Sequence, residues 1–178
     1  MYNKILNFWF HEIKPSQWWV KDKIFDNLIK KKFYYLHKQA NSCGLLSWRL
    51  SLKGRLAEII ILDQFSRNMF RGTSKAYESD TIALFLSQDA INHQADKQMN
   101  AFEKLFLFMP FMHSESIEFQ KVSLNLFQKL GIKKNIESAE RHYKVIEKFG
   151  RFPHRNIPLN RISSSEEKEF LKTPGSKF

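Results

Sequence analysis

The chain has 178 residues, a length typical of one domain, and 43% of them are hydrophobic, which is enough for a packed core. Only six Gly and five Pro are present, which argues against a loop-rich β architecture. The 29 Lys and Arg against 18 Asp and Glu give a formal net charge of +11. Such a surface attracts nucleic acid, anionic lipid or acidic proteins, but it is also compatible with a solvated surface that has no dedicated partner.

Membrane insertion and secretion are not expected. The longest apolar run, residues 105–112, is far shorter than the roughly 20 residues that span a bilayer. The N-terminal residues lack the pattern of a secretory leader. Cys43 is the only cysteine and cannot form an intrachain disulfide, which favours the reducing cytoplasm. We therefore expect a cytoplasmic protein without a membrane partner.

The first half of the chain has helical periodicity. A short opening helix around residues 5–9 precedes a turn at Pro15. From Asp22, apolar residues recur at spacings of three and four, which predicts a long helix ending near Cys43 and Gly44. Ser51 is the expected N-cap of the next helix, which ends near Gly72. Because that helix is apolar on more than one face, we expect it to be central.

The second half continues the pattern. One helix is expected from Thr73 or Asp80 towards His93, and another over residues 102–108, with a break near Pro110. Two more helices are expected, one from a Ser114 cap to Gly131 and one from an Asn135 cap to Gly150. The pair Ser163 and Glu166 has capping-box spacing and predicts a short last helix. No hairpin signal appears. We therefore predict an all-α fold of stacked antiparallel helices, with one domain over residues 1–172 and a frayed tail at 173–178.

Polar residues interrupt the central apolar helix. Asp63 and Arg67 lie four positions apart and share a helix face, as do Arg67 and Arg71, and Asn68 lies beside them. Asp63 can orient Arg67 so that its guanidinium binds a carboxylate or phosphate with two hydrogen bonds. Alternatively, these side chains join the helix to its neighbours and have no ligand.

Two further polar clusters follow. His113 and Glu115 lie at an expected helix start, where free amides favour anions, and His113 could transfer a proton near neutral pH. The second cluster lies on a loop rigidified by Pro153 and could grip an oxyanion; it consists of Arg151, His154, Arg155 and Asn156. Both sets could also be structural, as helix caps and ion-pair partners.

Other site classes find no support in the sequence. The six His do not fall in a zinc-binding pattern, and there is no paired-cysteine motif, glycine-rich phosphate loop or nucleophile elbow. We expect no metal and no cofactor. Whether the protein is an enzyme stays open.

The same segments resemble a known family. The resemblance is carried by residues 5–10 (ILNFWF), 18–22 (WWVKD), 54–73 (GRLAEIIILDQFSRNMFRGT), 109–115 (MPFMHSE) and 149–156 (FGRFPHRN). In this order they are similar to the bacterial proteins grouped as domain of unknown function 924. That resemblance implies an all-helical, tetratricopeptide-repeat-like fold and implies no activity. The family usually has Pro in place of Ser66, Gly in place of Asn160 and Thr in place of Ser164.

Two function hypotheses follow from these observations. In the first, the three clusters converge on one polar pocket for a small anionic ligand: His113 and His154 would be the acid or base, and the ligand would contact Asp63, Arg67, Asn68, Arg71, Glu115, Arg151, Arg155 and Asn156. In the second, a helical-repeat scaffold binds a peptide or protein and the clusters are structural. Nucleic-acid binding lacks a recognised motif, and a homodimer stays open.

Overall fold

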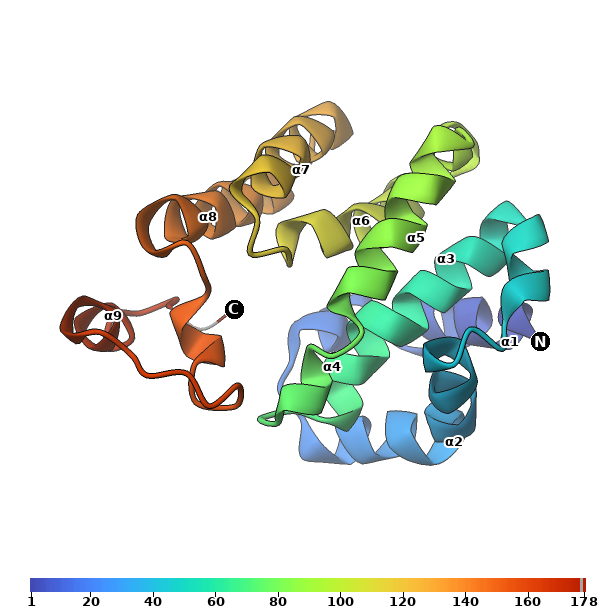
Figure 1. Cartoon of the computed structure of the whole chain (residues 1–178). Helices are drawn as coiled ribbons and strands as arrows, with labels where there is room; N and C mark the ends of the chain where they lie inside the picture. Colours follow the sequence, from blue (N-terminus) through green and yellow to red (C-terminus); the bar gives the residue numbers. More distant parts are fainter. Residues whose placement is uncertain (177) are drawn as a thin grey trace. The chain divides into compact units, whose positions relative to one another are not determined.

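The computed structural model describes residues 1–176 and 178, and these residues form helices and connecting loops with no strand (Figure 1). The predicted all-α class is confirmed. The chain divides into two compact units, described separately here: unit 1 is residues 1–71 and 75–110, and unit 2 is residues 72–74 and 111–178. Within the described residues, no helix is both long enough and apolar enough to cross a bilayer.

Unit 1 is built from helices that surround one central segment. Its α-helices are α1 (Tyr2–Asn7), α2 (Lys23–Asn41), α3 (Leu52–Ile60), α4 (Ser66–Met69), α5 (Asp80–Asn92) and most of α6 (Ala101–Met112). Its shorter 3-10 turns are Pro15–Trp19, Leu46–Leu50 and Ala95–Gln98. The predicted start of α2 is confirmed, because the Asp22 side chain accepts hydrogen bonds from the amides of Ile24 and Phe25 at 2.7 and 3.3 Å.

The central segment runs from α3 through a π-helical turn, Ile61–Phe65, into α4. From Leu56 to Phe65 its apolar side chains are fully buried, and α1 and α5 pack against α3 while α2 packs against α4. The Phe65 ring lies 5.4 Å from Trp9 and 5.1 Å from Phe33, measured between centroids. The expectation that this helix is central is therefore confirmed, and its polar residues are held inside a rigid apolar frame.

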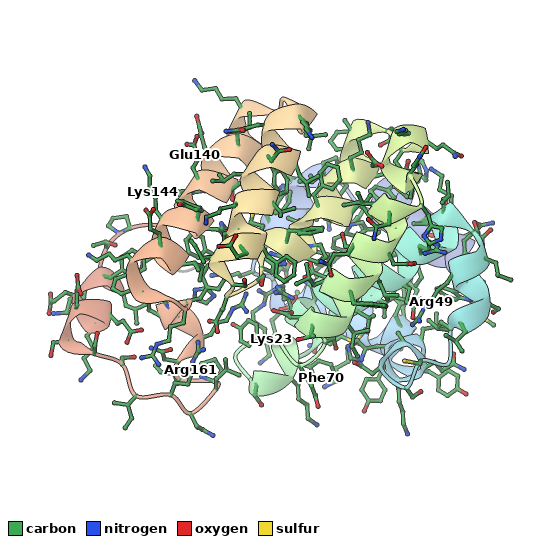
Figure 2. All side chains as sticks on the ribbon, turned by 45° about the horizontal axis from the view of Figure 1, so that its top comes forward. Lys23, Arg49, Phe70, Glu140, Lys144 and Arg161 are labelled. Atoms are coloured by element: carbon green, nitrogen blue, oxygen red, sulfur yellow. The ribbon has the colours of Figure 1, made fainter. Side chains whose placement is uncertain are left out.

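Unit 2 contains a helical hairpin followed by a loop and a short helix. α7 (Ile117–Leu130) and α8 (Lys133–Phe149) lie side by side, and α9 (Ser165–Phe170) follows the 3-10 turn Pro153–Arg155 (Figure 1). Gly131 and Gly150 end α7 and α8 with φ of +77° and +65°, as the sequence predicted. Glu140 and Lys144 lie on the side of α8 that faces away from α7 (Figure 2).

Two predicted helix starts are wrong in position. α7 begins at Ile117 with Ser116 as its N-cap, so Ser114 does not cap it; its Oγ instead accepts a hydrogen bond from the Ser116 amide. α8 begins at Lys133 after Ile132, ahead of the predicted cap Asn135. Ser114 and Ser116 both fit the cap pattern of α7, whereas α8 begins after Ile132 without a capping side chain, so the sequence alone does not fix either helix start.

The remaining differences are small. α6 continues through Pro110 and ends at Met112, two residues later, so the proline removes only a bond close to the helix end. The last capping box is formed by Ser164 and Glu167, one residue after the predicted pair. Asn160 adopts a left-handed φ of +53°, so the position where the family usually has Gly keeps a conformation that Asn tolerates.

Candidate functional site

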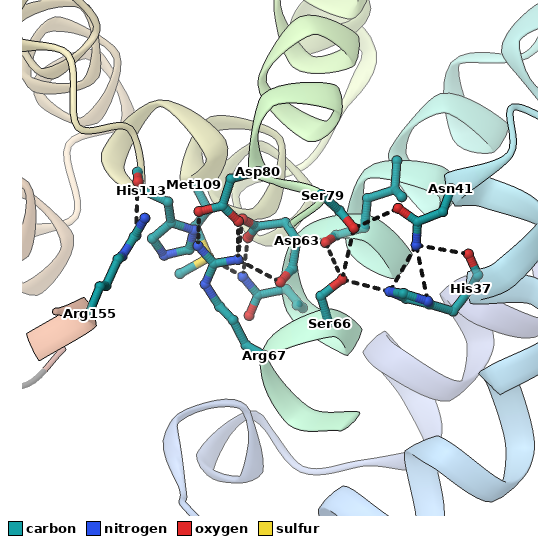
Figure 3. A network of polar contacts seen from close by, with 12 residues as sticks. His37, Asn41, Asp63, Ser66, Arg67, Ser79, Asp80, Met109, His113 and Arg155 are labelled. Carbon is teal, nitrogen blue, oxygen red and sulfur yellow. Dashed lines mark hydrogen bonds and ion pairs between the residues drawn. The ribbon is translucent and has the colours of Figure 1, made fainter. Parts of the chain in front are cut away.

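The polar residues of the central segment in unit 1 form ion pairs. Arg67 donates to both carboxylate oxygens of Asp80 at 2.8 and 2.9 Å, and its Nη1 lies 3.1 Å from Asp63 Oδ1 (Figure 3). Burial lowers the pKa of Arg67, but the charges of Asp63 and Asp80 outweigh it and raise that pKa above its ordinary value. Arg67 therefore joins the central segment to α5 as a permanent cation.

Arg71 and Asn68 join the same segment to α2. Arg71 donates to the two oxygens of Asp26 at 2.6 and 2.8 Å, and Asn68 Nδ2 donates to Asp26 Oδ1 at 2.8 Å. Asp26 and Asp80 were not among the sequence-predicted site residues, since they lie 45 and 13 positions from their arginines. The contacts of Asp63, Arg67, Asn68 and Arg71 match the structural alternative of the sequence analysis, and their ligand role stays a prediction.

A second buried network in unit 1 was missed by sequence reasoning. His37 Nε2 lies 2.7 Å from Ser66 Oγ, and Ser66 Oγ donates to the Leu62 carbonyl oxygen at 2.6 Å (Figure 3). The single hydroxyl proton is therefore used, so Nε2 must carry its own proton and donate to Ser66. Asn41 Nδ2 lies 3.1 Å from Nδ1, and Asn41 Oδ1 accepts from Ser79 at 2.7 Å.

This pairing resembles the serine and histidine of a nucleophilic site but does not function as one. A general base must accept the serine proton, whereas His37 donates to Ser66 in this arrangement. Ser66 is also fully buried. Burial lowers the pKa of His37, against the raising charge of Glu78, which favours the neutral ring. We assign this network to the stability of unit 1.

In unit 2, Glu115 is held by the loop that follows α8. Arg161 donates to both oxygens of Glu115 at 2.7 and 2.9 Å, and the Phe152 amide donates to Glu115 at 2.8 Å. Burial raises the pKa of Glu115, but the hydrogen bonds from Arg161 and Phe152 and the charge of Arg155 outweigh it, so the pKa lies below its ordinary value. Glu115 thus stays ionised and fixes the loop.

Arg151 and Asn156 stabilise the next part of that loop. Arg151 donates to the two oxygens of Glu167 at 2.7 and 2.9 Å and also to the Ile162 carbonyl. Chiefly through the hydrogen bond from Arg151, the pKa of Glu167 falls to about 2. Asn156 is fully buried and donates to Ser163 Oγ at 3.0 Å.

Two of the remaining predicted residues of unit 2, His154 and Arg155, lie against the Phe152 ring. The Arg155 guanidinium lies 4.6 Å from the ring centroid, and the His154 ring lies 5.6 Å from it. His142, which the sequence analysis did not select, also lies 5.6 Å from Phe152 and 6.3 Å from the His113 ring. Arg155 Nη2 donates to the His113 carbonyl at 2.9 Å (Figure 3). We call His113, His142, His154 and Arg155 the cationic cluster, because Arg155 is charged and the three rings become cations when they are protonated.

His142 is electrically coupled to the other members of the cationic cluster. Burial lowers its pKa, and so do neighbouring His113, Arg155 and His154, so that it lies well below the ordinary value. His142 Nδ1 lies 2.8 Å from the Ser138 carbonyl oxygen, which only accepts hydrogen bonds. Nδ1 therefore carries the proton of the neutral ring, and Nε2 keeps a lone pair.

The structure brings the second and third sequence clusters together within unit 2, through Glu115 with Arg161 and through Arg155 with His113. The first cluster lies in unit 1. Convergence of all three clusters on one pocket stays a prediction. Among the described residues, no group of three or more His, Cys, Asp or Glu side chains is arranged to hold a metal ion.

The fold and these ion-pair networks define an all-helical protein in which ion pairs and hydrogen bonds join the helices and loops. The model of a family described as bacterial protein of unknown function (DUF924) matches residues 5–175, and the chain belongs to this family. A solved structure of a protein of unknown function, ATU0120 from Agrobacterium tumefaciens, is similar with a TM-score of 0.92 and 36% identity, covering 96% of each chain. Comparison with proteins of curated function finds no match.

Proposed function

We propose that the cationic cluster of unit 2 binds a small anion, either a phosphate or a carboxylate. The observation that carries this proposal is the gathering of the His142 and His154 rings and the Arg155 guanidinium around Phe152, with the His113 ring 6.3 Å from His142. Arginine suits both oxyanions because its planar donors match their oxygens. Glu115, whose charge interacts with Arg155, is bound by Arg161 and the Phe152 amide.

The electrostatics of His142 support the same assignment. Its pKa is lowered by burial and by neighbours of positive or potentially positive charge. An anion beside these rings would favour their protonated forms and so reverse part of that shift. Binding should therefore be accompanied by proton uptake, and His113 and His154 are the members of the predicted site that could pass a proton to a bound ligand.

Thermal unfolding in the presence of inorganic phosphate and of citrate tests the proposal. A ligand at about 100 times its Kd adds about 2.7 kcal/mol, enough to raise the Tm of a chain this size by several degrees. The increase should be lost in Arg155→Gln and in His154→Gln. It should remain in the control His93→Gln, because His93 is the exposed C-cap residue of α5 in unit 1. No increase with either anion, or an increase kept by both variants, would contradict the proposal.

The peptide-binding scaffold remains the second hypothesis. The α7–α8 hairpin is the kind of antiparallel pair from which tetratricopeptide-like repeats are built, but the repeat-like detail stays a prediction. A cytoplasmic location is part of the proposal as well. It is supported by the single cysteine, Cys43, which is exposed and free.

A further inference from the structure

The outward side of α2 in unit 1 carries an unusual set of side chains. Positions 24, 28, 31, 35 and 38 follow spacings of four and three and therefore share one side of the helix. The buried residues of α2, among them Phe25, Ile29 and Phe33, lie on the opposite side. α2 thus buries one apolar face in the core and presents a second, mixed face to solvent.

Large apolar side chains on this outward face are exposed. Ile24 is 82% exposed, Tyr35 71% and Leu28 41%. Trp19 and Val20, just before the helix in the chain, are also exposed. Single exposed apolar residues need no explanation, but three at helical spacing on one face indicate an interaction surface.

The same face is basic. Lys31 lies between Leu28 and Tyr35, and Lys38 follows Tyr35. Lys23, Lys30 and Lys32 flank this face, and Lys32 is paired with Glu12 at 3.3 Å. The ammonium groups of Lys30 and Lys32 lie 5.8 and 4.8 Å from the Phe70 and Phe8 ring centroids, so their aliphatic stems run along aromatic surface. The acidic residue of the helix, Asp26, is buried and bound by Arg71.

We propose that this face of α2 docks on an anionic lipid bilayer, with Ile24, Leu28 and Tyr35 entering the interface and the lysines contacting headgroups. A helix that lies in the plane of a membrane combines an apolar stripe with flanking Lys, and Tyr and Trp favour the headgroup level. The expectation of no membrane partner rested on the lack of a spanning segment, which such a helix does not require.

Other occupants fit the same face less well. A second copy docked symmetrically would place the lysines of one chain against those of its partner, since a two-fold interface joins like patches. Nucleic acid is bound through phosphate contacts and ring stacking, which gives no use to the exposed aliphatic Ile24 and Leu28. Lipid headgroups satisfy the lysines, and acyl chains accept the aliphatic side chains.

Flotation of the full chain with vesicles tests the proposal. One vesicle set is phosphatidylcholine alone, and the other is an equal mixture with phosphatidylglycerol. We expect binding to the mixture alone, weakened by salt. Each surface Lys contributes roughly 1 kcal/mol, so the double variant Lys31→Gln with Lys38→Gln should bind about 30-fold more weakly. Ile24→Ser with Tyr35→Ser should lower binding at least about tenfold.

The matched control removes exposed apolar side chains elsewhere. Leu50 and Ile162 are 92% and 91% exposed and lie outside α2, so Leu50→Ser with Ile162→Ser should leave vesicle binding unchanged. Trp19 gives a second readout, because the other three Trp are buried, and its fluorescence should shift to the blue on the mixed vesicles. All three double variants change exposed positions, and thermal unfolding checks that each is folded.

Four results would overturn the proposal. The first two are that the protein does not bind the mixed vesicles, or that the Ile24→Ser with Tyr35→Ser variant binds them as well as the native protein. The other two are that the Leu50→Ser with Ile162→Ser control loses as much vesicle binding as the α2 variants, or that the protein binds a random oligonucleotide more tightly than the vesicles and the α2 variants abolish that binding. The proposal is independent of anion binding by unit 2. Vesicle binding should therefore be unaffected by Arg155→Gln.

Discussion

Glu115 and Arg161 are 46 positions apart in the chain and form a bidentate ion pair, with N–O distances of 2.7 and 2.9 Å. Glu115 precedes α7, and Arg161 lies in the loop between α8 and α9. Because Glu115 also accepts the Phe152 amide, this pair fixes the ring around which three members of the cationic cluster lie. The candidate anion site therefore depends on an ion pair that contacts no ligand in our proposal.

Replacement of this carboxylate should destabilise the protein measurably. Glu115→Gln leaves the partly buried Arg161 without a counter-charge, and we expect a loss of about 2 kcal/mol in the free energy of unfolding. Urea unfolding measures it. The matched control is Glu118→Gln, whose exposed pair with Lys121 should contribute almost nothing. Equal losses in the free energy of unfolding of the two variants would argue against a stabilising role of the Glu115–Arg161 ion pair.

Arg67 should be the more costly of the two arginines of unit 1 to remove. Its side chain is 19% exposed and lies between Asp63 and Asp80, whereas Arg71 is 37% exposed and has one carboxylate partner. Arg67→Ala removes the guanidinium that both Asp63 and Asp80 contact and should cost about 3 kcal/mol or more. Arg71→Ala should cost less. Chemical denaturation of both variants checks the order, and the reverse order would refute this account.

His37 should make stability depend on pH on the acid side of neutrality. Its pKa in the folded chain is lowered by burial below the ordinary 6.5. The unfolded chain then binds more protons, so the contribution is complete above about pH 6.5 and is lost as the pH falls below it. His142 acts in the same direction. Thermal unfolding from pH 7.5 to about 5 should show this loss, and His37→Gln should reduce the slope. An unchanged slope in that variant would assign the effect elsewhere.

Glu167 should govern stability at lower pH. Its pKa falls from the ordinary 4.5 to about 2, chiefly through Arg151. Its contribution is therefore present above about pH 4.5 and lost as the pH falls towards 2. In Arg151→Gln the folded pKa of Glu167 should return towards its ordinary value, which a carboxyl NMR titration measures directly. A titration midpoint that stays near that of the native protein would mean that Arg151 is not the cause.

Much of the fold follows from sequence because local signals agree with one another. The 3.6-residue periodicity predicts α2 and the central segment, and Asp22, Gly131 and Gly150 mark helix ends by side-chain capping or by left-handed backbone. The helix start near Ser114 was misplaced because Ser114 and Ser116 both meet the cap pattern, and the start near Asn135 was misplaced because α8 begins after Ile132, which has no capping side chain.

The candidate site was predictable in part. The charged residues flanked by Phe, Leu and Ile could be recognised as groups that need partners inside the fold. Their partners could not, because Asp26, Arg161 and His142 are brought near by tertiary packing and carry no local signal. His142 is on the buried side of an otherwise polar helix, where a histidine is usually structural.

The most direct test of the anion site is an NMR titration of the six histidine rings with inorganic phosphate. Our account predicts that the ring signals of His113, His142 and His154 move together and towards their protonated positions. The exposed His11 and His93 of unit 1 should stay in place and act as internal controls. If the three rings of unit 2 do not move while the protein remains folded, or if His93 moves equally, the cationic cluster is not an anion site.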